Sequence, residues 1–280
     1  MSYTFQTLKV TFPAQYVLHV ELNNTERLNA FDRILWNDVK ECFMRIDADS
    51  AVRVAVISGA GKLFSAGIDC IYLSAVNTLS EINNSEVTDF ARKAYYLRRS
   101  VKILQDSFTA IESCNKPVIA VVHNACIGAG VDLITACDIR YCSQDAYFCV
   151  KEIDFGLAAD IGTLQRLPKI VGNNSLVREL CFTGRKFSST EALNFGLVNK
   201  ILQTKEIALA EAFKTASIIA SKSPVAIVGT KHLLNYSRDH SVNEGLEYTA
   251  LWNSAMLNSE DLIEAFKSSM TKVKPTFAKL

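Results

Sequence analysis

The sequence has no clear excess of charge of either sign. Its 280 residues include 30 basic and 29 acidic side chains, which gives a formal net charge of +1. Proteins that bind nucleic acid or an anionic membrane surface usually carry a basic excess or a basic stripe. The balanced charge argues against both classes, and we expect no nucleic-acid partner.

Long apolar runs are missing as well. No stretch of about 18 apolar residues occurs, so we expect no membrane span. The first residues, MSYTFQTLKVTFP, show neither the basic-then-apolar pattern of a secretory signal nor an arginine-rich amphipathic stretch. The last three residues, Ala278-Lys279-Leu280, are close to the S-K-L peroxisomal signal. They predict a peroxisomal location, with the mitochondrion as the alternative.

Metal-binding patterns are also lacking. The eight cysteines lie mostly in apolar runs and form no C-x-x-C pair, and the four histidines are scattered without ligand spacing. We therefore expect buried thiols in a reducing compartment, and no metal site.

The order of apolar patterns indicates an α/β fold. Apolar strands alternate with helical patterns over the first part of the chain, and only helical patterns follow. We predict a core at residues 1–204 and a C-terminal helical region at 205–280. The apolar faces of that region should pack on the core or on neighbouring subunits.

Several local elements follow from periodicity and turn residues. Alternation at residues 8–12 and 17–22 predicts two strands, and Asn29 is expected to cap the helix that follows. The polar segment 74–88 reads as a loop over the strand ends, and residues 87–113 as a long helix.

Two turns rich in small residues follow apolar strands. One is FSAGID, around Gly67, and the other is Gly128-Ala129-Gly130, between the strand VIAVV and the helix VDLITACD. Such a turn leaves unpaired N–H groups beside the positive end of a helix. Donors from both turns could converge on one carbonyl oxygen as an oxyanion hole. A tight connection without a ligand is the alternative.

Three acidic residues stand in mostly apolar surroundings: Asp132, Glu152 and Asp160. Burial disfavours an ionised carboxylate, so we expect raised pKa values and proton exchange near neutral pH. Each also has a structural alternative. Asp132 suits a helix N-terminus, Glu152 could pair with Lys151 or Arg166, and Asp160 could form a turn.

These segments, taken in order, resemble the crotonase (enoyl-CoA hydratase/isomerase) superfamily over roughly residues 8 to 203. The motifs are RLNAF, FSAGID, KPVIAVVHNACIGAGVDLITACDIRYCSQDAYF, EIDFGLAADIGTLQRLPKIVG and FTGRKFSSTEALNFGLVNKI. The resemblance implies a spiral core of repeated β-β-α units with a C-terminal helical appendage. It also implies an acyl-CoA thioester substrate and a homo-oligomer, either a trimer or a hexamer.

The resemblance assigns roles to the turns and the acids. The oxyanion hole maps to the N–H groups of Ile68 and Ala129, where the second position is commonly glycine in the family. Hydratases of the family use two glutamates, which correspond here to Asp132 and Glu152. A third acid, Asp160, makes the set similar to that of the dienoyl-CoA isomerases.

That similarity implies conversion of a 3,5-dienoyl-CoA to a 2,4-dienoyl-CoA in fatty acid β-oxidation. Glu152 would remove a proton from carbon 2, Asp160 would protonate carbon 6, and Asp132 would orient or tune the pair. CoA is part of the substrate, and no metal or bound redox cofactor is implied. The expected substrate contacts are Lys62, Ser65, Ala66, Gly67, Ile68 and Asp69.

Other readings remain open at this point. Within the family they are hydration of a 2-enoyl-CoA and the 3,2-shift of a single double bond. From other classes they are an inactive crotonase-fold assembly subunit and a Ser-His-Asp hydrolase built on Ser65 and His123. Ser65 lacks the G-x-S-x-G elbow that such hydrolases carry.

Overall fold

The computed structural model describes residues 2–69 and 89–280, so the predicted loop 74–88 and Cys70 lie outside the described residues. The described strands are β1 (Leu8–Ala14), β2 (Val17–Leu22), β3 (Val54–Gly59), β4 (Val118–Val122), β5 (Ala125–Ile127), β6 (Ile139–Ser143), β7 (Tyr147–Cys149), β8 (Phe187–Ser188) and β9 (Lys200–Leu202). The described helices are η1 (Thr25–Arg27), α1 (Arg33–Ala48), α4 (Phe90–Ser113), α5 (Ala129–Thr135), η2 (Glu152–Phe155), α6 (Thr163–Ile170), α7 (Asn174–Thr183), α8 (Ser189–Asn194), α9 (Lys205–Ala220), α10 (Pro224–Ser237), α11 (Val242–Met256) and α12 (Glu260–Thr271).

The described strands form two sheets, and two consecutive β-β-α units each contribute one strand to each sheet. The larger sheet has the order β1-β2-β3-β4-β6-β9, and the smaller has β5-β7-β8. Only the β1–β2 pair of the larger sheet is antiparallel. Strand β4 belongs to the larger sheet and β5 to the smaller one, and α5 follows; β6 and β7 then enter the two sheets in the same order. This arrangement confirms the predicted α/β class with repeated β-β-α units.

Both faces of the larger sheet are buried. Along β3, Ala55 and Ile57 belong to the core cluster that contains the apolar side of α1, while Val54 and Val56 belong to the cluster on the α9 side. Central parallel strands covered on both sides are expected to be continuously apolar, as β3 and β4 are.

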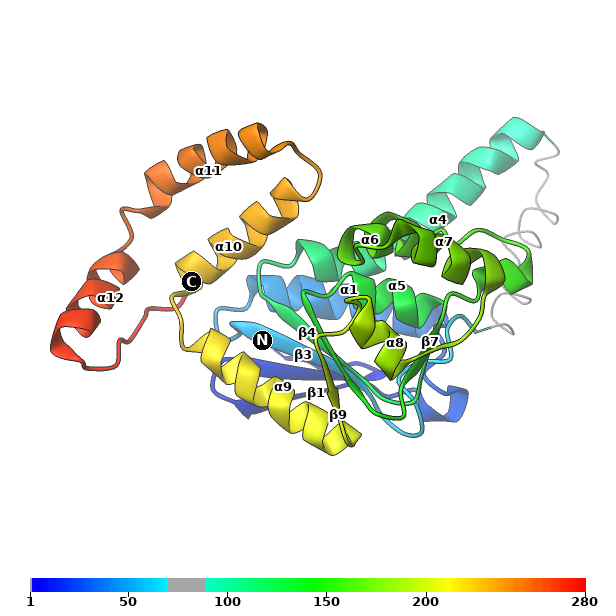
Figure 1. Cartoon of the computed structure of the whole chain (residues 1–280), viewed down its shortest axis with the longest axis horizontal. Helices are drawn as coiled ribbons and strands as arrows, with labels where there is room; N and C mark the ends of the chain where they lie inside the picture. The colour runs from blue at the N-terminus through cyan, green and yellow to red at the C-terminus, as the bar shows by residue number, and fades with distance from the viewer. Residues whose placement is uncertain (1, 70–88) are drawn as a thin grey trace.

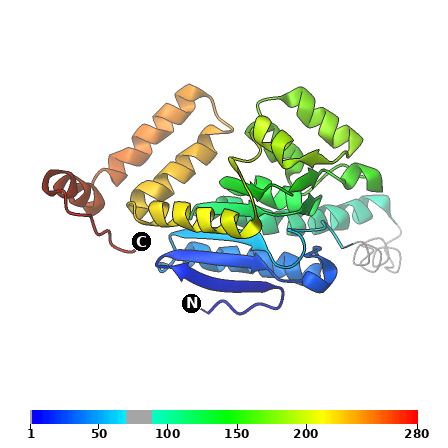
Figure 2. The same ribbon diagram turned by 60° about the horizontal axis from the view of Figure 1, so that its bottom comes forward.

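Helix α9 packs directly on the sheet through an alanine at every fourth position. The buried alanines are Ala208, Ala212, Ala216 and Ala220. Small side chains at this spacing form one face of the helix and let its backbone approach the strands closely. Figure 2 shows α9 lying along the sheet. The predicted boundary at 204/205 therefore coincides with the start of a helix that still belongs to the core layers.

Helix α10 still contacts the core, where the buried Lys231 donates to Asp138 at 2.8 Å, while α11 and α12 extend away from it (Figure 1). Several of their apolar side chains are exposed, among them Leu246, Leu251 and Phe266. The helical appendage predicted for the C-terminal region is therefore made by these three helices.

The predicted helix cap was wrong. Asp32, not Asn29, caps α1, because its side chain accepts hydrogen bonds from the N–H groups of Ile34 and Leu35. Asn29 is fully buried and has a positive φ of 51°. Its side-chain amide donates to the carbonyl of Ala60 and to two further carbonyls, so it ties the RLNAF turn to the chain beyond β3.

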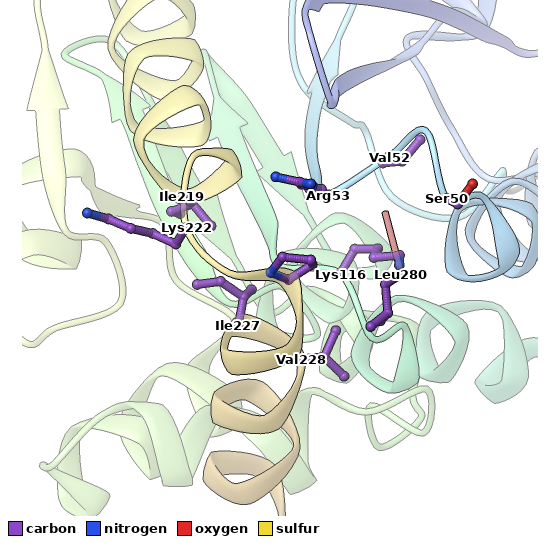
Figure 3. Close-up of a pocket in the computed structure, with 10 residues that line it drawn as sticks. Ser50, Val52, Arg53, Lys116, Ile219, Lys222, Ile227, Val228 and Leu280 are labelled. Atoms are coloured by element: carbon purple, nitrogen blue, oxygen red, sulfur yellow. The ribbon is translucent and has the colours of Figure 1, made fainter. Parts of the chain in front are cut away.

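The C-terminal segment returns from α12 to the core and is held by Arg53. The buried Arg53 guanidinium lies 4.1 Å from the centre of the Tyr16 ring and donates to the carbonyls of Phe277 (2.8 Å) and Ala278 (2.9 Å). Figure 3 shows Leu280 in the adjoining pocket. One arginine thus fastens the end of the described chain to the start of β3.

We expect Arg53→Met to release this segment. The substitution removes charge-assisted hydrogen bonds of about 1.5–3 kcal/mol each while keeping an apolar stem. Residues 273–280 should then be trimmed several-fold faster by a carboxypeptidase, as followed by intact mass. Lys222→Met, in the wall of the same pocket, is the matched control and should trim at the wild-type rate. Equal trimming of all three proteins would contradict the role of Arg53.

Candidate active site

Two turns of small residues lie against each other beyond the ends of β3 and β5. The N–H of Ser65 donates to the carbonyl of Ala125 (3.1 Å), and the N–H of Ile127 donates to the carbonyl of Ser65 (3.1 Å). Gly67 has a φ of +97°, and a Cβ there would lie 2.9 Å from the Ile127 carbonyl oxygen. The FSAGID turn is therefore joined to the glycine turn through the backbone, and position 67 has no room for a side chain.

The two predicted oxyanion-hole residues sit on these joined turns. Ala129 is the first residue of α5 and follows Gly128, whose φ is +48°. The first N–H groups of a helix have no carbonyl partner within that helix and carry its positive dipole end. Ile68 follows Gly67 directly and forms an isolated parallel bridge with Phe31. Donation from Ile68 and Ala129 to a substrate stays a prediction.

Ser65 holds the turn together. It is fully buried, its hydroxyl donates to the Asn29 carbonyl (2.8 Å), and its oxygen accepts from the N–H of Gly67 (3.2 Å). The Nε2 of His123 lies 3.0 Å from the Gly61 carbonyl. These contacts commit Ser65 to the backbone and give no support to a Ser-His-Asp hydrolase.

Asp132 is a buried carboxylate with one bonded and one unbonded oxygen. It lies in the first turn of α5, and its Oδ1 accepts from the N–H of Thr163 at 2.5 Å. Its Oδ2 is buried without a hydrogen-bond partner among the described residues. Burial raises the pKa of Asp132 to about 6, although the hydrogen bond from the Thr163 N–H opposes the rise.

Glu152 faces the glycine turn from the first position of η2. A Cβ on Gly128 would lie 3.0 Å from its Oε1, and its Oε2 is buried with no partner among the described residues. Burial, and then the charge of Asp132, raises the pKa of Glu152 to about 7. The ion pairs suggested as alternatives are made with other acids, since Lys151 pairs with Asp154 and Arg166 pairs with Glu112.

Asp160 lies on the chain segment that enters α6. Its side chain is partly buried, and burial raises its pKa. The charge of Asp160 in turn helps to raise the pKa values of both Asp132 and Glu152, so the three carboxylates act on one another electrostatically. The structure therefore brings all three predicted acids into one region, and none of them is bathed in solvent.

The remaining predicted contacts differ in exposure. Lys62 is exposed in the turn after β3, and Ala66 is partly buried. The Asp69 carboxylate is largely buried and forms an ion pair with Arg27 of the RLNAF turn. Arg27 links the two motifs, and its side chain remains 48% exposed. Substrate contacts by Lys62, Ala66 and Asp69 stay predictions.

Three contacts of this region were not predicted from the sequence, although Gly128 was named there as part of the glycine turn. Gly128 leaves the space beside the Glu152 carboxylate, while Gln105 and Arg166 contact the backbone of the Asp160 segment. A glycine before a helix is a recognisable signal. The other two contacts join distant segments, and no local pattern reveals them.

The seven described cysteines are free thiols; six are buried, and Cys181 is partly buried. Within residues 2–69 and 89–280, no three histidine, cysteine or acidic side chains are grouped closely enough to hold a metal ion. None of the described helices has the length and apolar character needed to cross a bilayer.

Comparison with known proteins gives a consistent picture. The profile of the enoyl-CoA hydratase/isomerase family matches residues 14–279. The chain is 50% identical to the rat mitochondrial Delta(3,5)-Delta(2,4)-dienoyl-CoA isomerase, covering 99% of this chain and 84% of that protein. It is 48% identical to the peroxisomal protein of the same name from Arabidopsis thaliana, covering 94% and 93%. A putative enoyl-CoA hydratase from Streptomyces coelicolor has a similar fold, with a TM-score of 0.86 and 24% identity over 99% and 96% of the chains.

Proposed function

The chain belongs to the enoyl-CoA hydratase/isomerase, or crotonase, family, and from that premise we propose that it is a dienoyl-CoA isomerase. It converts 3,5-dienoyl-CoA to 2,4-dienoyl-CoA in fatty acid β-oxidation. The relatives with 50% and 48% identity carry that name. The observation that carries the proposal is the third carboxylate, Asp160, whose chain segment is bonded to Asp132 through the N–H of Thr163 and whose charge helps to raise the pKa values of Asp132 and Glu152.

The joined turns suit the first half of this reaction. The N–H groups of Ile68 and Ala129 hold the thioester oxygen, and Glu152 removes a proton from carbon 2. The electron pair of that C–H bond spreads through the diene to the thioester oxygen as a dienolate. Each such donor stabilises the developing charge by roughly 3 kcal/mol. The Glu152 carboxylate suits this role because it lies against Gly128, the residue before Ala129.

The second half needs an acid at the far end of the diene. Asp160 delivers a proton to carbon 6, which leaves double bonds at carbons 2 and 4, now conjugated with the thioester. One proton leaves and one returns, so the reaction as proposed requires neither a metal nor a redox cofactor. Asp132, fixed by Thr163, acts on Glu152 through its charge.

An ultraviolet assay tests this function. Supplied with a 3,5-dienoyl-CoA, the protein should produce the absorption band of the 2,4-conjugated product without addition of water. A 2-enoyl-CoA and a 3-enoyl-CoA, tested in parallel, report the two rival activities of the family. Rapid hydration of the 2-enoyl-CoA with no turnover of the diene would replace this proposal with the hydratase.

We expect a bell-shaped dependence of kcat/KM on pH. The carboxylate set must keep one proton for carbon 6 and one empty base for carbon 2. At low pH every carboxyl group of the set is protonated, so no base remains for carbon 2. Above about pH 7, the pKa of Glu152, the set loses its last proton, so no acid remains for carbon 6. Asp132→Asn removes a charge that raises the Glu152 pKa, so the alkaline limb should move to lower pH. A profile that stays flat up to pH 9 would contradict this assignment.

An inactive assembly subunit fits the site less well. Asp132 and Glu152 each keep a buried oxygen without a partner among the described residues, an arrangement that destabilises the fold. A chain that served assembly alone would gain stability from neutral residues at these positions. Buried carboxylates with raised pKa values are typical of catalytic sites.

Assembly and location are further parts of the proposal. The exposed apolar side chains of α10–α12 favour a homo-oligomer, a trimer or a hexamer, and light scattering would measure its mass. CoA should bind near Lys62 and the RLNAF turn. Ala278-Lys279-Leu280 supports a peroxisomal location, although relatives are named both peroxisomal and mitochondrial. Imaging a protein tagged at its N-terminus, with and without these three residues, would separate the two compartments.

A further inference from the structure

The segment that carries Asp160 is fixed at successive residues by side chains from two helices. The Nε2 of Gln105, on α4, donates to the carbonyl oxygen of Asp160 at 2.7 Å. Arg166, on α6, points its guanidinium at the Ile161 carbonyl (3.4 Å). The N–H of Thr163 donates to Asp132. The backbone around Asp160 is therefore anchored on one side to α4 and on the other to Asp132.

Gly162 makes the contact with Arg166 possible. It has a φ of +144°, and a Cβ there would lie 1.8 Å from the Nη1 of Arg166. The guanidinium thus occupies the space in which any other residue would place its side chain. Arg166 is almost fully buried and forms an ion pair with Glu112 of α4 at 2.9 Å. The pair keeps the guanidinium against the backbone of residues 161–162.

A second ion pair supports Glu112 from the other side. Arg238, at the end of α10, lies 2.6 Å from Oε1 of Glu112, the carboxylate oxygen that Arg166 does not contact. These residues surround a cavity of about 310 Å³, whose walls include Gln105, Glu112, Gly162, Gln165, Arg166 and Arg238. Its walls also include Ile161, the residue after Asp160, and do not include Asp132, Glu152 or Asp160.

We propose that Gln105 is a positioning residue for the proton delivery step, with the Arg166–Glu112 pair as its second support. This inference rests on the proposed isomerase function. Gln105 holds the Asp160 carbonyl, and a fixed main chain aims the carboxyl group at carbon 6 of the bound diene. Misplacement of a reacting group by about 1 Å can lower a rate by about 10²-fold.

The test separates the two proton transfers. In D2O, removal and return of a proton at carbon 2 exchanges hydrogen for deuterium in the recovered substrate and needs Glu152 alone. Isomerisation also forms the C–H bond at carbon 6 and needs Asp160. Gln105→Met, which keeps length but loses the donor, should lower kcat about 10²-fold with little change in KM, while exchange at carbon 2 continues.

Three comparisons make this result specific. Gln165→Met, the same change on another wall of the cavity, should keep the wild-type kcat. In an Asp160→Asn background, Gln105→Met should have no additional effect, because the two act through one step. Gln105→Asn replaces the methionine variant if that variant does not fold, and should give the same separation of exchange from isomerisation.

Three other outcomes would contradict the role proposed for Gln105. An unchanged kcat, an equal loss of exchange and isomerisation, or additive effects with Asp160→Asn would each overturn the positioning role. Wild-type protein that isomerises no diene would instead reject the proposed function itself. The two failures are therefore distinguishable.

Discussion

Asp160→Asn should lower the rate of diene isomerisation by about 10³-fold while leaving deuterium exchange at carbon 2 intact. General acids contribute about 10²–10⁴-fold, and an amide cannot deliver the proton. Glu152→Gln should abolish both processes, because no base remains beside the glycine turn. The ultraviolet band of the 2,4-diene measures the first process, and mass spectrometry of recovered substrate in D2O measures the second.

The pair of variants distinguishes the base from the acid, an assignment that rests on family resemblance. If Asp160→Asn lost exchange while Glu152→Gln kept it, the two roles would be reversed. Asp154→Asn is the control, because Asp154 lies in η2 near Glu152 but is exposed and pairs with Lys151. It should retain most of the wild-type rate. An Asp160→Asn protein with full isomerase activity would refute the three-acid mechanism.

The parts of the fold that depend on local periodicity could be predicted. The α/β order, the first two strands and the long helix before β4 all follow from the spacing of apolar residues, and the structure confirms them. A helical pattern was also predicted from residue 205, where α9 begins, while the division of the chain into a core and a C-terminal region stays a prediction. The packing of α9 on the sheet was not predicted, although its four alanines at a spacing of four were a readable signal.

Long-range contacts account for the errors and omissions. Asn29 has the side chain of a helix cap, but its amide is held by carbonyls more than thirty residues away, and Asp32 takes the cap. The contact between Gln105 and the Asp160 carbonyl joins residues 55 apart. Nothing in local propensity encodes either contact, since each depends on how the β-β-α units stack.

The candidate site could be predicted only in part from the sequence. The three acids could be identified singly, because apolar neighbours surround them, but their proximity came from family resemblance alone. The structure supplies the physical link, in which the charges of Asp132 and Asp160 help to raise the Glu152 pKa. It also shows that Ser65, expected to contact substrate, is fully buried and donates its hydroxyl to the Asn29 carbonyl.

Glu152→Gln should make the protein more stable at alkaline pH while it removes activity. The folded-state pKa of Glu152 is about 7, against 4.5 for an ordinary glutamate. A raised pKa means that the fold favours the protonated form. The stabilisation is complete below about pH 4.5 and is lost as pH rises through 7, by about 3 kcal/mol in all. The neutral amide has no such loss, because it cannot ionise.

Urea unfolding at pH 5 and pH 8 measures this difference. The two proteins should have similar unfolding free energies at pH 5, and at pH 8 the variant should be about 2 kcal/mol more stable, since the unbonded amide group offsets part of the gain. Glu247→Gln, at an exposed position of α11, should change neither value. A variant less stable than wild type at pH 8 would mean that ionised Glu152 has a stabilising partner. The proposed mechanism requires the opposite, since a base that is poorly solvated and unpaired binds the proton of carbon 2 more strongly than a satisfied one.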